Sequence, residues 1–156
     1  MRTIRVYTDG SCSGNPGPGA FCAIILDGEQ EKTLSDAFLD TTNNRMELLS
    51  MIVALRELKD DLKSGVKVDI YSDSAYVINA LTQGWLASWQ KNGWRSAGKT
   101  PLKNQDLWLE MAELIKLGNI SFFKVKGHAD DEYNNRCDQI AQNLTQQMVQ
   151  EKAKNP

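Results

Sequence analysis

Four carboxylates of the chain stand where a site for divalent cations could form. Asp9 and Asp73 each come at the end of a segment in which apolar and polar residues alternate, the pattern of a β-strand. Parallel strands of one sheet end at a common edge, where α/β sheets place their sites, so these two residues are expected to be neighbours. Helices packed on the same sheet can bring Glu47 and Asp138 to that edge.

The chemistry of such a cluster follows from its charge. Four carboxylates within a few ångströms repel one another strongly unless cations neutralise them. Oxygen ligands without an imidazole cluster favour Mg²⁺ or Mn²⁺ over zinc. Two such ions about 4 Å apart suit the in-line hydrolysis of a phosphodiester. The sequence therefore indicates a metal-dependent phosphodiester site, although spacing alone does not establish the geometry.

Each carboxylate also has a purely structural interpretation. Asp9 and Asp73 could cap a turn or a helix. Glu47 is expected in the first turn of a helix, where the helix dipole and a capping box with Asn44 would favour it. Asp138 is harder to explain in this way, because it lies within a predicted helix beside apolar positions.

The single histidine, His128, follows the last predicted strand in a loop and is preceded by Gly127. A lone histidine is often a surface or structural residue. Here the loop lies at the same sheet edge, where an imidazole can carry protons near neutral pH.

A basic, tryptophan-rich segment covers residues 84–105. The whole chain has a net charge of −2, from 18 basic and 20 acidic residues, which argues weakly against nucleic-acid binding. The segment nevertheless contains four cations, no acidic residue and three tryptophans, which are Lys91, Arg95, Lys99 and Lys103 with Trp85, Trp89 and Trp94. The tryptophans could bind substrate or could pack helices together.

The order of predicted elements indicates one α/β domain over residues 1–156, with a tail from about 149. Three strands with short connections are followed by alternating helices and strands, which is typical of a mixed sheet flanked by helices. Strands are expected over 3–8, 21–26, 32–39, 66–71 and 120–125. Helices are expected from 41–44 to 58, over 74–81 and 105–116, and from 131 or 134 onward. Residues 10–19 are expected to form a turn, and Asp27-Gly28 a hairpin.

Composition excludes several classes of protein. With 41% apolar and 24% charged residues, the chain is neither disordered, collagen-like nor a coiled coil. The longest apolar run, Phe21–Leu26, is far shorter than the ~20 residues of a membrane span, and the first residues lack a secretory signal. Three scattered cysteines without a CxxC pair fit a reducing compartment. We expect a cytoplasmic monomer without membrane partners.

Four sequence blocks resemble the motifs of the type 1 ribonuclease H family. Their order and spacing over about residues 3–145 are similar to those of bacterial ribonuclease HI, and four ordered blocks are more specific than any one short motif. The blocks are Tyr7–Gly19, Thr42–Leu48, Ser72–Ser74, and Lys126–Ala129 with Asn135–Asp138.

The resemblance implies a ribonuclease H-like fold, with a five-stranded mixed sheet of order 3-2-1-4-5, flanking helices and a basic handle at about 84–105. It implies an endonuclease that hydrolyses the RNA strand of RNA–DNA hybrids with two Mg²⁺ ions, or Mn²⁺ as a substitute, leaving 5′-phosphate and 3′-hydroxyl ends. Asp9, Glu47, Asp73 and Asp138 match the family's metal-binding carboxylates, and His128 matches its proton carrier.

The resemblance also implies substrate contacts. The positions that match contacts with the minor-groove side of the hybrid are Cys12, Asn15, Asn43 and Asn44. Thr42 and Asn104 match a pocket for a phosphate of the DNA strand, and the tryptophans and cations of 84–105 match the handle. Three features depart from the family: Ala75 replaces a frequent glutamine, Asp40 stands near a position that can hold arginine, and 130–132 is acidic.

Two other functions remain open from the sequence. The chain could be a hybrid-binding module of the same fold without catalysis, although a binder would gain nothing from an acidic cluster facing phosphates. It could also be a nuclease or strand transferase of the integrase type, since fold alone does not decide function.

Overall fold

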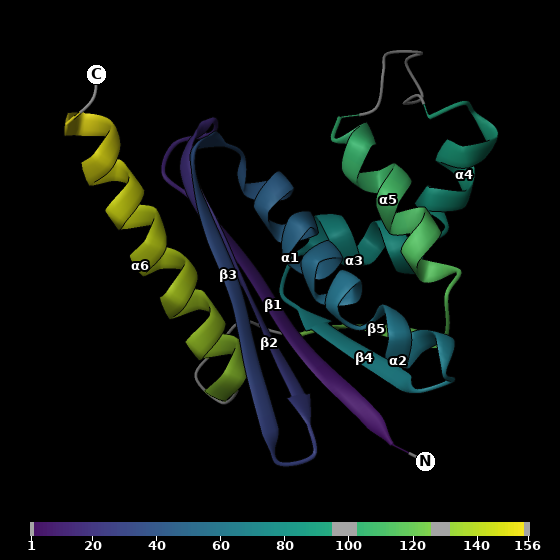
Figure 1. Cartoon of the computed structure of the whole chain (residues 1–156). Helices are drawn as coiled ribbons and strands as arrows, with labels where there is room; N and C mark the ends of the chain where they lie inside the picture. The colour runs from purple at the N-terminus through teal and green to yellow at the C-terminus, as the bar shows by residue number, and fades with distance from the viewer. Residues whose placement is uncertain (1, 95–102, 126–131, 155–156) are drawn as a thin grey trace.

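A five-stranded mixed sheet forms the centre of the molecule (Figure 1). The structure is a computed structural model, and it describes residues 2–94, 103–125 and 132–154. The strands are β1 (Thr3–Cys12), β2 (Gly17–Asp27), β3 (Gln30–Thr41), β4 (Lys67–Ser72) and β5 (Ile120–Lys124). The helices are α1 (Asn43–Glu57), α2 (Lys59–Lys63), α3 (Ala75–Thr82), α4 (Trp85–Lys91), α5 (Gln105–Ile115) and α6 (Glu132–Lys154).

The strand order β3-β2-β1-β4-β5 confirms the predicted topology. The first three strands pair antiparallel, whereas β4 pairs parallel with both β1 and β5. The parallel pairs are the ones reached through helices, as a right-handed crossover requires. As a result, the carboxyl ends of β1, β4 and β5 point the same way.

The sheet separates α6 from the other helices (Figure 1). On one face, the apolar stripe of α1, which includes Leu48, Met51 and Leu55, is fully buried against the sheet together with residues of α3 and α5. On the other face, Cys137 and Ala141 of α6 pack onto β1 and β2. Burial on both faces explains why nearly every residue of β2 is buried, including the predicted apolar run.

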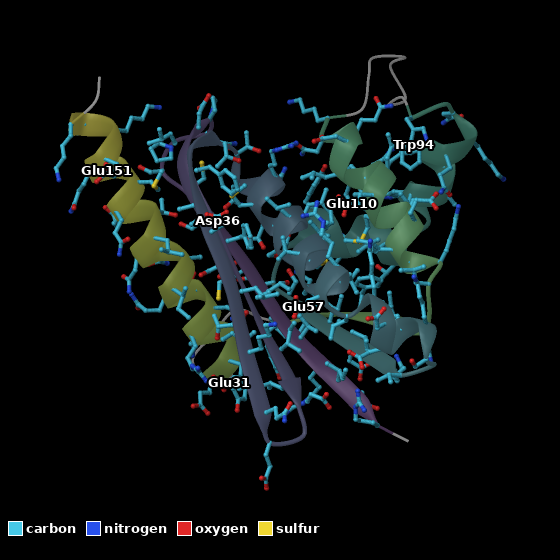
Figure 2. All side chains as sticks on the ribbon, viewed as in Figure 1. Glu31, Asp36, Glu57, Trp94, Glu110 and Glu151 are labelled. Carbon is cyan, nitrogen blue, oxygen red and sulfur yellow. The ribbon has the colours of Figure 1, made fainter. Side chains whose placement is uncertain are left out.

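The outer surfaces carry the charged side chains, many of them in ion pairs (Figure 2). Glu57 at the end of α1 pairs with Lys32 of β3, and Glu31 pairs with Arg136 of α6. These contacts lie toward the β2–β3 hairpin, where Gly28 takes a positive φ of 62° in the predicted turn. No described helix is long and apolar enough to span a membrane.

The prediction of a turn over 10–19 is wrong at both ends, because β1 continues to Cys12 and β2 begins at Gly17. Gly10 and Gly19 lie inside the strands and serve close packing rather than turning. A Cβ on Gly10 would lie 2.5 Å from the backbone nitrogen of Glu47, and one on Gly19 would lie 2.6 Å from the backbone oxygen of Ser11. Glycine therefore lets α1 and the strands approach where any side chain would collide.

The predicted helices form with small changes in length, and two short ones were not predicted. The hydroxyl of Thr42 caps α1 by accepting a hydrogen bond from the backbone N–H of Arg45 (3.2 Å). α6 continues without interruption through 149–154, where a tail was expected. The additional helices are α2, which follows α1 directly, and α4, which lies within the basic segment.

Candidate metal centre

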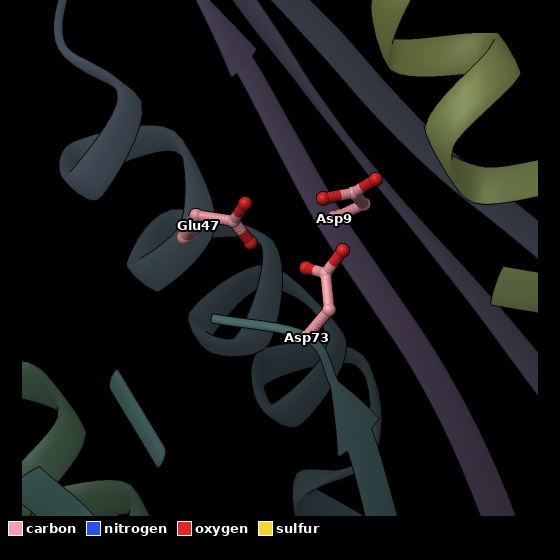
Figure 3. Close-up of side chains that lie close together, drawn as sticks. All are labelled: Asp9, Glu47 and Asp73. Atoms are coloured by element: carbon pink, nitrogen blue, oxygen red, sulfur yellow. The ribbon is translucent and has the colours of Figure 1, made fainter. Parts of the chain in front are cut away.

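Three of the four predicted carboxylates meet at the carboxyl end of the sheet. Asp9 comes from β1, Glu47 from α1, and Asp73 from the residue after β4 (Figure 3). One carboxylate oxygen from each lies within 4.8 Å of the others. This convergence confirms the predicted shared edge and gives three oxygen ligands at a spacing suited to a divalent cation.

Close packing of α1 on β1 sets the distance between the first two carboxylates. Asp9 lies inside β1 rather than after it, and its Oδ1 accepts a hydrogen bond from the N–H of Gly10 (2.9 Å). Because Gly10 has no side chain, the backbone of Glu47 can approach the strand directly. Both side chains are almost fully enclosed, with exposed fractions of 3% and 5%.

The capping interpretation is wrong for Glu47 and Asp73. α1 begins at Asn43 with Thr42 as its cap, which places Glu47 in the second turn and rules out a capping box with Asn44. α3 is capped by Ser74, whose hydroxyl accepts from the N–H of Val77 (3.3 Å). Neither carboxylate satisfies a helix end, so their burial needs another explanation.

The carboxyl groups of the cluster hold their protons unusually tightly. Burial, and after it the charge of Asp73, raises the pKa of Asp9 to about 7. Burial also raises the pKa of Glu47 well above its ordinary value, with the charge of Asp9 as the next cause. Burial and the charge of Asp138 raise the pKa of Asp73, opposed by Lys124. Among the described residues, the charge of Lys124 does not prevent the rise in the pKa of Asp73.

Two oxygen atoms of the cluster lack a hydrogen-bond partner among the described residues. They are Oδ2 of Asp9 and Oε2 of Glu47, and both are buried. Burying a polar atom without a partner is costly, so native proteins usually satisfy such atoms with another group or an ion. Hard carboxylate oxygens with this spacing, and no cysteine or histidine among the clustered ligands, fit Mg²⁺ or Mn²⁺.

Asp138 lies beside this cluster without joining it. It is half-buried on α6, and it raises the pKa of Asp9 through a side-chain hydrogen bond and its charge, and the pKa of Asp73 through its charge. The adjacent Cys137 is buried, and its thiol donates to the backbone oxygen of Tyr7 (3.1 Å), which fixes α6 on β1. The amide nitrogen of Gln142 donates to both carboxylate oxygens of Asp138 (3.1 and 3.0 Å). Sequence reasoning missed Gln142.

Residues predicted to contact the minor-groove side gather where β1 ends and α1 begins. The side-chain oxygen of Asn15 accepts a hydrogen bond from the backbone N–H of Asn43 (3.2 Å), which joins the two predicted blocks. Asn44 is exposed in the first turn of α1. The thiol of Cys12 donates to the backbone oxygen of Thr41 (3.4 Å). These predicted residues therefore lie on connected segments of one surface.

Arg45 connects the two residues predicted to hold a phosphate, and sequence reasoning missed it. Its backbone N–H donates to Thr42, while its guanidinium donates to the side-chain oxygen of Asn104 (3.4 Å). The guanidinium also pairs with both oxygens of Asp106 (3.0 and 2.6 Å), which raises the pKa of Arg45. Asp40, near this region, is exposed on β3.

The tryptophans of the basic segment divide between packing and exposure. Trp89 packs edge-on against the fully buried Trp108 (centroids 5.1 Å apart), and Trp94 is half-buried against the core near α4 (Figure 2). Trp85 is 40% exposed. The packing interpretation therefore holds for Trp89 and Trp94. Trp108, which anchors them, was not singled out from the sequence, although it lies in the apolar stripe of the predicted helix.

The remaining predicted site residues differ in what can be said of them. Lys91 and Lys103 are exposed, and Ala75 is exposed at the start of α3. His128, Arg95, Lys99 and residues 130–131 lie outside the described residues.

Comparison with known proteins decides the family. The model of the RNase H family matches residues 1–146, which include all four carboxylates. The chain belongs to the RNase H family. It is 51% identical over 140 residues to ribonuclease H of Chlorobaculum parvum, covering 90% of this chain and 93% of that protein. It is 50% identical over 153 residues to ribonuclease H of Thermoanaerobacter sp., covering 98% and 94%. These relatives are ribonucleases, and the carboxylate cluster is compatible with a catalytic site in this member.

Solved structures of the family share the fold. LC9-RNase H1, a type 1 RNase H with the type 2 active-site motif, has a TM-score of 0.81 at 25% identity, over 95% of this chain and 74% of that one. LC11-RNase H1, solved in complex with an RNA/DNA hybrid, has a TM-score of 0.70 at 24% identity, over 94% and 99%. The predicted fold class is therefore confirmed.

Proposed function

We propose that the chain is an endonuclease that hydrolyses the RNA strand of RNA–DNA hybrids with Mg²⁺, or with Mn²⁺ as a substitute. The observation that carries this proposal is the buried cluster of Asp9, Glu47 and Asp73, with its unpartnered oxygens, in a member of the RNase H family. Residues 1–156 act as a single domain, a monomer in the cytoplasm. Its products are 5′-phosphate and 3′-hydroxyl ends.

Four carboxylates of the chain hold the metal. Asp9, Glu47 and Asp73 offer oxygens from the cluster, and Asp138 offers a fourth carboxylate from α6. Two divalent ions, when bound, supply activation of the attacking water and stabilisation of the leaving 3′-oxygen. The burial of Asp9 and Glu47 keeps these ligands in fixed positions, so that little reorganisation accompanies the reaction.

His128 moves the proton. In the sequence it follows β5 and stands directly after Gly127, and the carboxyl ends of β4 and β5 lie side by side. An imidazole titrates near neutral pH, so it can accept a proton from the attacking water or give one to the leaving group.

The surface at the start of α1 selects the substrate. Cys12, Asn15, Asn43 and Asn44 read the minor groove, where the 2′-hydroxyls of one strand distinguish RNA from DNA without reference to base sequence. Thr42 and Asn104 receive a phosphate of the DNA strand. The handle over 84–105, with Trp85 exposed and Lys91 and Lys103 in solvent, adds electrostatic attraction for the duplex.

A cleavage assay on labelled duplexes tests this function. An RNA–DNA hybrid, a duplex RNA and a duplex DNA of one sequence are incubated with the chain and Mg²⁺, with EDTA as the metal-free control. Only the RNA strand of the hybrid is expected to be cut, internally, and only with metal. The end chemistry is confirmed if the 3′-hydroxyl end of one product can be ligated to a 5′-phosphorylated oligonucleotide, and if the other product carries a 5′-phosphate.

The alternative function, a hybrid-binding module without catalysis, gives a different result in the same assay. Such a module would retard the hybrid in a gel while leaving the RNA strand intact at every Mg²⁺ concentration. That result would reject the proposed enzyme and keep the proposed substrate. The cluster of three carboxylates argues against it, because without cations the acids would repel the phosphates of a bound duplex.

A further inference from the structure

Gln142 donates hydrogen bonds to both carboxylate oxygens of Asp138, the one predicted metal ligand that is not part of the three-acid cluster. Its amide nitrogen lies 3.1 Å from Oδ1 and 3.0 Å from Oδ2 of Asp138, one helical turn away on α6. The other three carboxylates meet within 4.8 Å, while Asp138 acts on Asp9 through a side-chain hydrogen bond and its charge, and on Asp73 through its charge. The structure thus has a complete cluster of three acids and a fourth acid held next to it.

We infer that Gln142 is a positioning residue that competes with divalent cations for the oxygens of Asp138 and so lowers the affinity of the chain for these cations. This role rests on the proposed function, because it needs a metal to compete with the amide. It assigns to Gln142 a part that Asp9, Glu47 and Asp73 do not play.

Competition for the oxygens of Asp138 is the first reason. For Asp138 to give an oxygen to a cation, that oxygen must leave the amide of Gln142. A hydrogen bond of this kind contributes a small net free energy, and losing it weakens cation binding by about two- to tenfold. Removing the amide should therefore strengthen binding by the same factor.

Repulsion inside the metal-free cluster is the second reason, and it acts in the same direction. The amide stabilises the negative charge of Asp138, whose carboxylate lies near Asp9 and Asp73 and raises the pKa of both. Without Gln142, the carboxylate loses its donor and the acids repel more freely, so a cation relieves more repulsion when it binds. The metal-free chain should also become slightly less stable.

α6 offers a matched control. Gln139 donates to the side-chain oxygen of Asn143 (3.0 Å) in a pair with the same four-residue spacing, and both residues are exposed. This pair supports the helix by the same type of contact but touches no carboxylate of the site. If Gln142 only stabilises the helix, Gln139→Leu and Gln142→Leu should therefore have equal effects on the stability of the fold and on cation affinity.

The test measures binding of Mg²⁺ and Mn²⁺ by isothermal titration calorimetry, without nucleic acid, together with the rise in Tm on adding Mg²⁺. We expect Gln142→Leu to bind about two- to tenfold more tightly and Gln142→Lys, whose charged amine holds Asp138 more strongly and repels cations, to bind more weakly. Gln139→Leu should match the wild type. Opposite shifts at position 142 are not expected from a structural role.

Two results overturn the inference, and they differ from failure of the proposed function. If Gln142→Leu binds cations with unchanged or lower affinity while the wild type binds normally, Gln142 does not restrain Asp138. If the wild type itself binds neither cation, the metal-dependent function is wrong, and the role of Gln142 falls with it.

Discussion

The carboxylate of Asp9 on β1 and the carboxylates on the outer face of α5 have opposite surroundings. Glu110 on α5 accepts hydrogen bonds from Nε and Nη2 of Arg56 on α1, which holds the pKa of Glu110 below its ordinary value. Asp106 pairs in the same way with Arg45, with the same effect. Asp9 instead faces other acids in a buried site, and its pKa rises to about 7.

The contrast shows how one residue type can serve stability or function according to its partner. A surface carboxylate paired with arginine is satisfied inside the protein and contributes little beyond that. The buried acids Asp9 and Glu47 each keep one oxygen without a hydrogen-bond partner among the described residues. An added cation or proton would satisfy these oxygens. Pairing inside the fold therefore separates structural acids from functional ones, which neither residue type nor charge count can do.

The largest expected effect comes from removing one acid of the cluster. Asp73→Asn should lower the rate of hybrid cleavage by more than the ~10²–10⁴-fold of general acid–base catalysis, because it removes a metal ligand. Asp9→Asn should do the same. Initial rates at saturating Mg²⁺ measure the effect, with Glu110→Gln as a matched acid-to-amide control that should cleave normally. Near-normal cleavage by Asp73→Asn would contradict the metal assignment.

Replacing the proton carrier should have the next largest effect. His128→Ala should lower the rate of cleavage by about 10²–10⁴-fold while leaving residual activity and nearly unchanged affinity for the hybrid. The reason is that the histidine moves a proton but does not hold the metal. Single-turnover rates and a separate binding assay in Ca²⁺ distinguish the two. Cleavage at the parent rate across pH 5–9 would make the histidine structural.

The comparison between paired and unpaired charges also applies to cations. The basic segment, residues 84–105, contains four cations and no acidic residue that could pair with them. Changing all four to glutamine should weaken hybrid binding and flatten its dependence on salt by up to about 0.9 units per lost phosphate contact. The four positions are Lys91, Arg95, Lys99 and Lys103. Binding is measured at several salt concentrations.

A control for this experiment removes the same charge elsewhere. The control replaces four lysines outside the segment by glutamine, namely Lys59, Lys63, Lys116 and Lys152. If both quadruple variants lose the same affinity and salt slope, the handle has no special role in binding.

The buried acids should destabilise the metal-free fold as pH rises. The native state keeps a proton on Asp9 up to about pH 7, whereas the unfolded chain releases it near pH 4, so stability falls across this window. Asp9→Asn should therefore match the wild type near pH 4 and be more stable by about 1–3 kcal/mol at pH 7.5 in EDTA. Urea unfolding measures this difference, which should shrink when Mg²⁺ is added. A variant less stable than the wild type at pH 7.5 in EDTA would show that repulsion does not dominate the site.

The surface pair should show the smallest effect, and with the opposite sign. Because Arg56 lowers the pKa of Glu110, the pair stabilises the fold above about pH 4.5 and loses this contribution as pH falls. Glu110→Gln should cost less than about 1 kcal/mol at pH 7 and nothing near pH 3. Urea unfolding at low and high salt measures it. If Glu110→Gln raised the free energy of unfolding at pH 7, the surface acids would not differ from the buried acids in the sign of their effect on stability.

Much of this architecture could be predicted because local patterns determine it. Alternation in 66–71 and the apolar stripe of α1 gave the right elements, and their order gave the sheet. Asp9 and Asp73 were predicted to be neighbours from strand direction alone. The extent of β1 was missed because a glycine-rich segment suits both a turn and close packing, and only the contact of Gly10 with α1 distinguishes them.

The missed side-chain contacts arise from long-range packing and from choices among rotamers. Arg45 and Asp106 are 61 residues apart, so no spacing rule could pair them. Gln142 and Asp138 are four apart on one helix, a spacing that could have suggested the contact.

The docking of α6 on β1 and β2 has a consequence for how the protein is made. A chain that emerges from the ribosome from its amino terminus presents Asp9, Glu47 and Asp73 long before Asp138. The three-acid cluster therefore belongs to the early part of the nascent chain, whereas the fourth acid arrives with the last helix. Synthesis itself thus imposes an order on the carboxylates, and the proposed four-acid metal site can be complete only when translation of the domain is nearly finished.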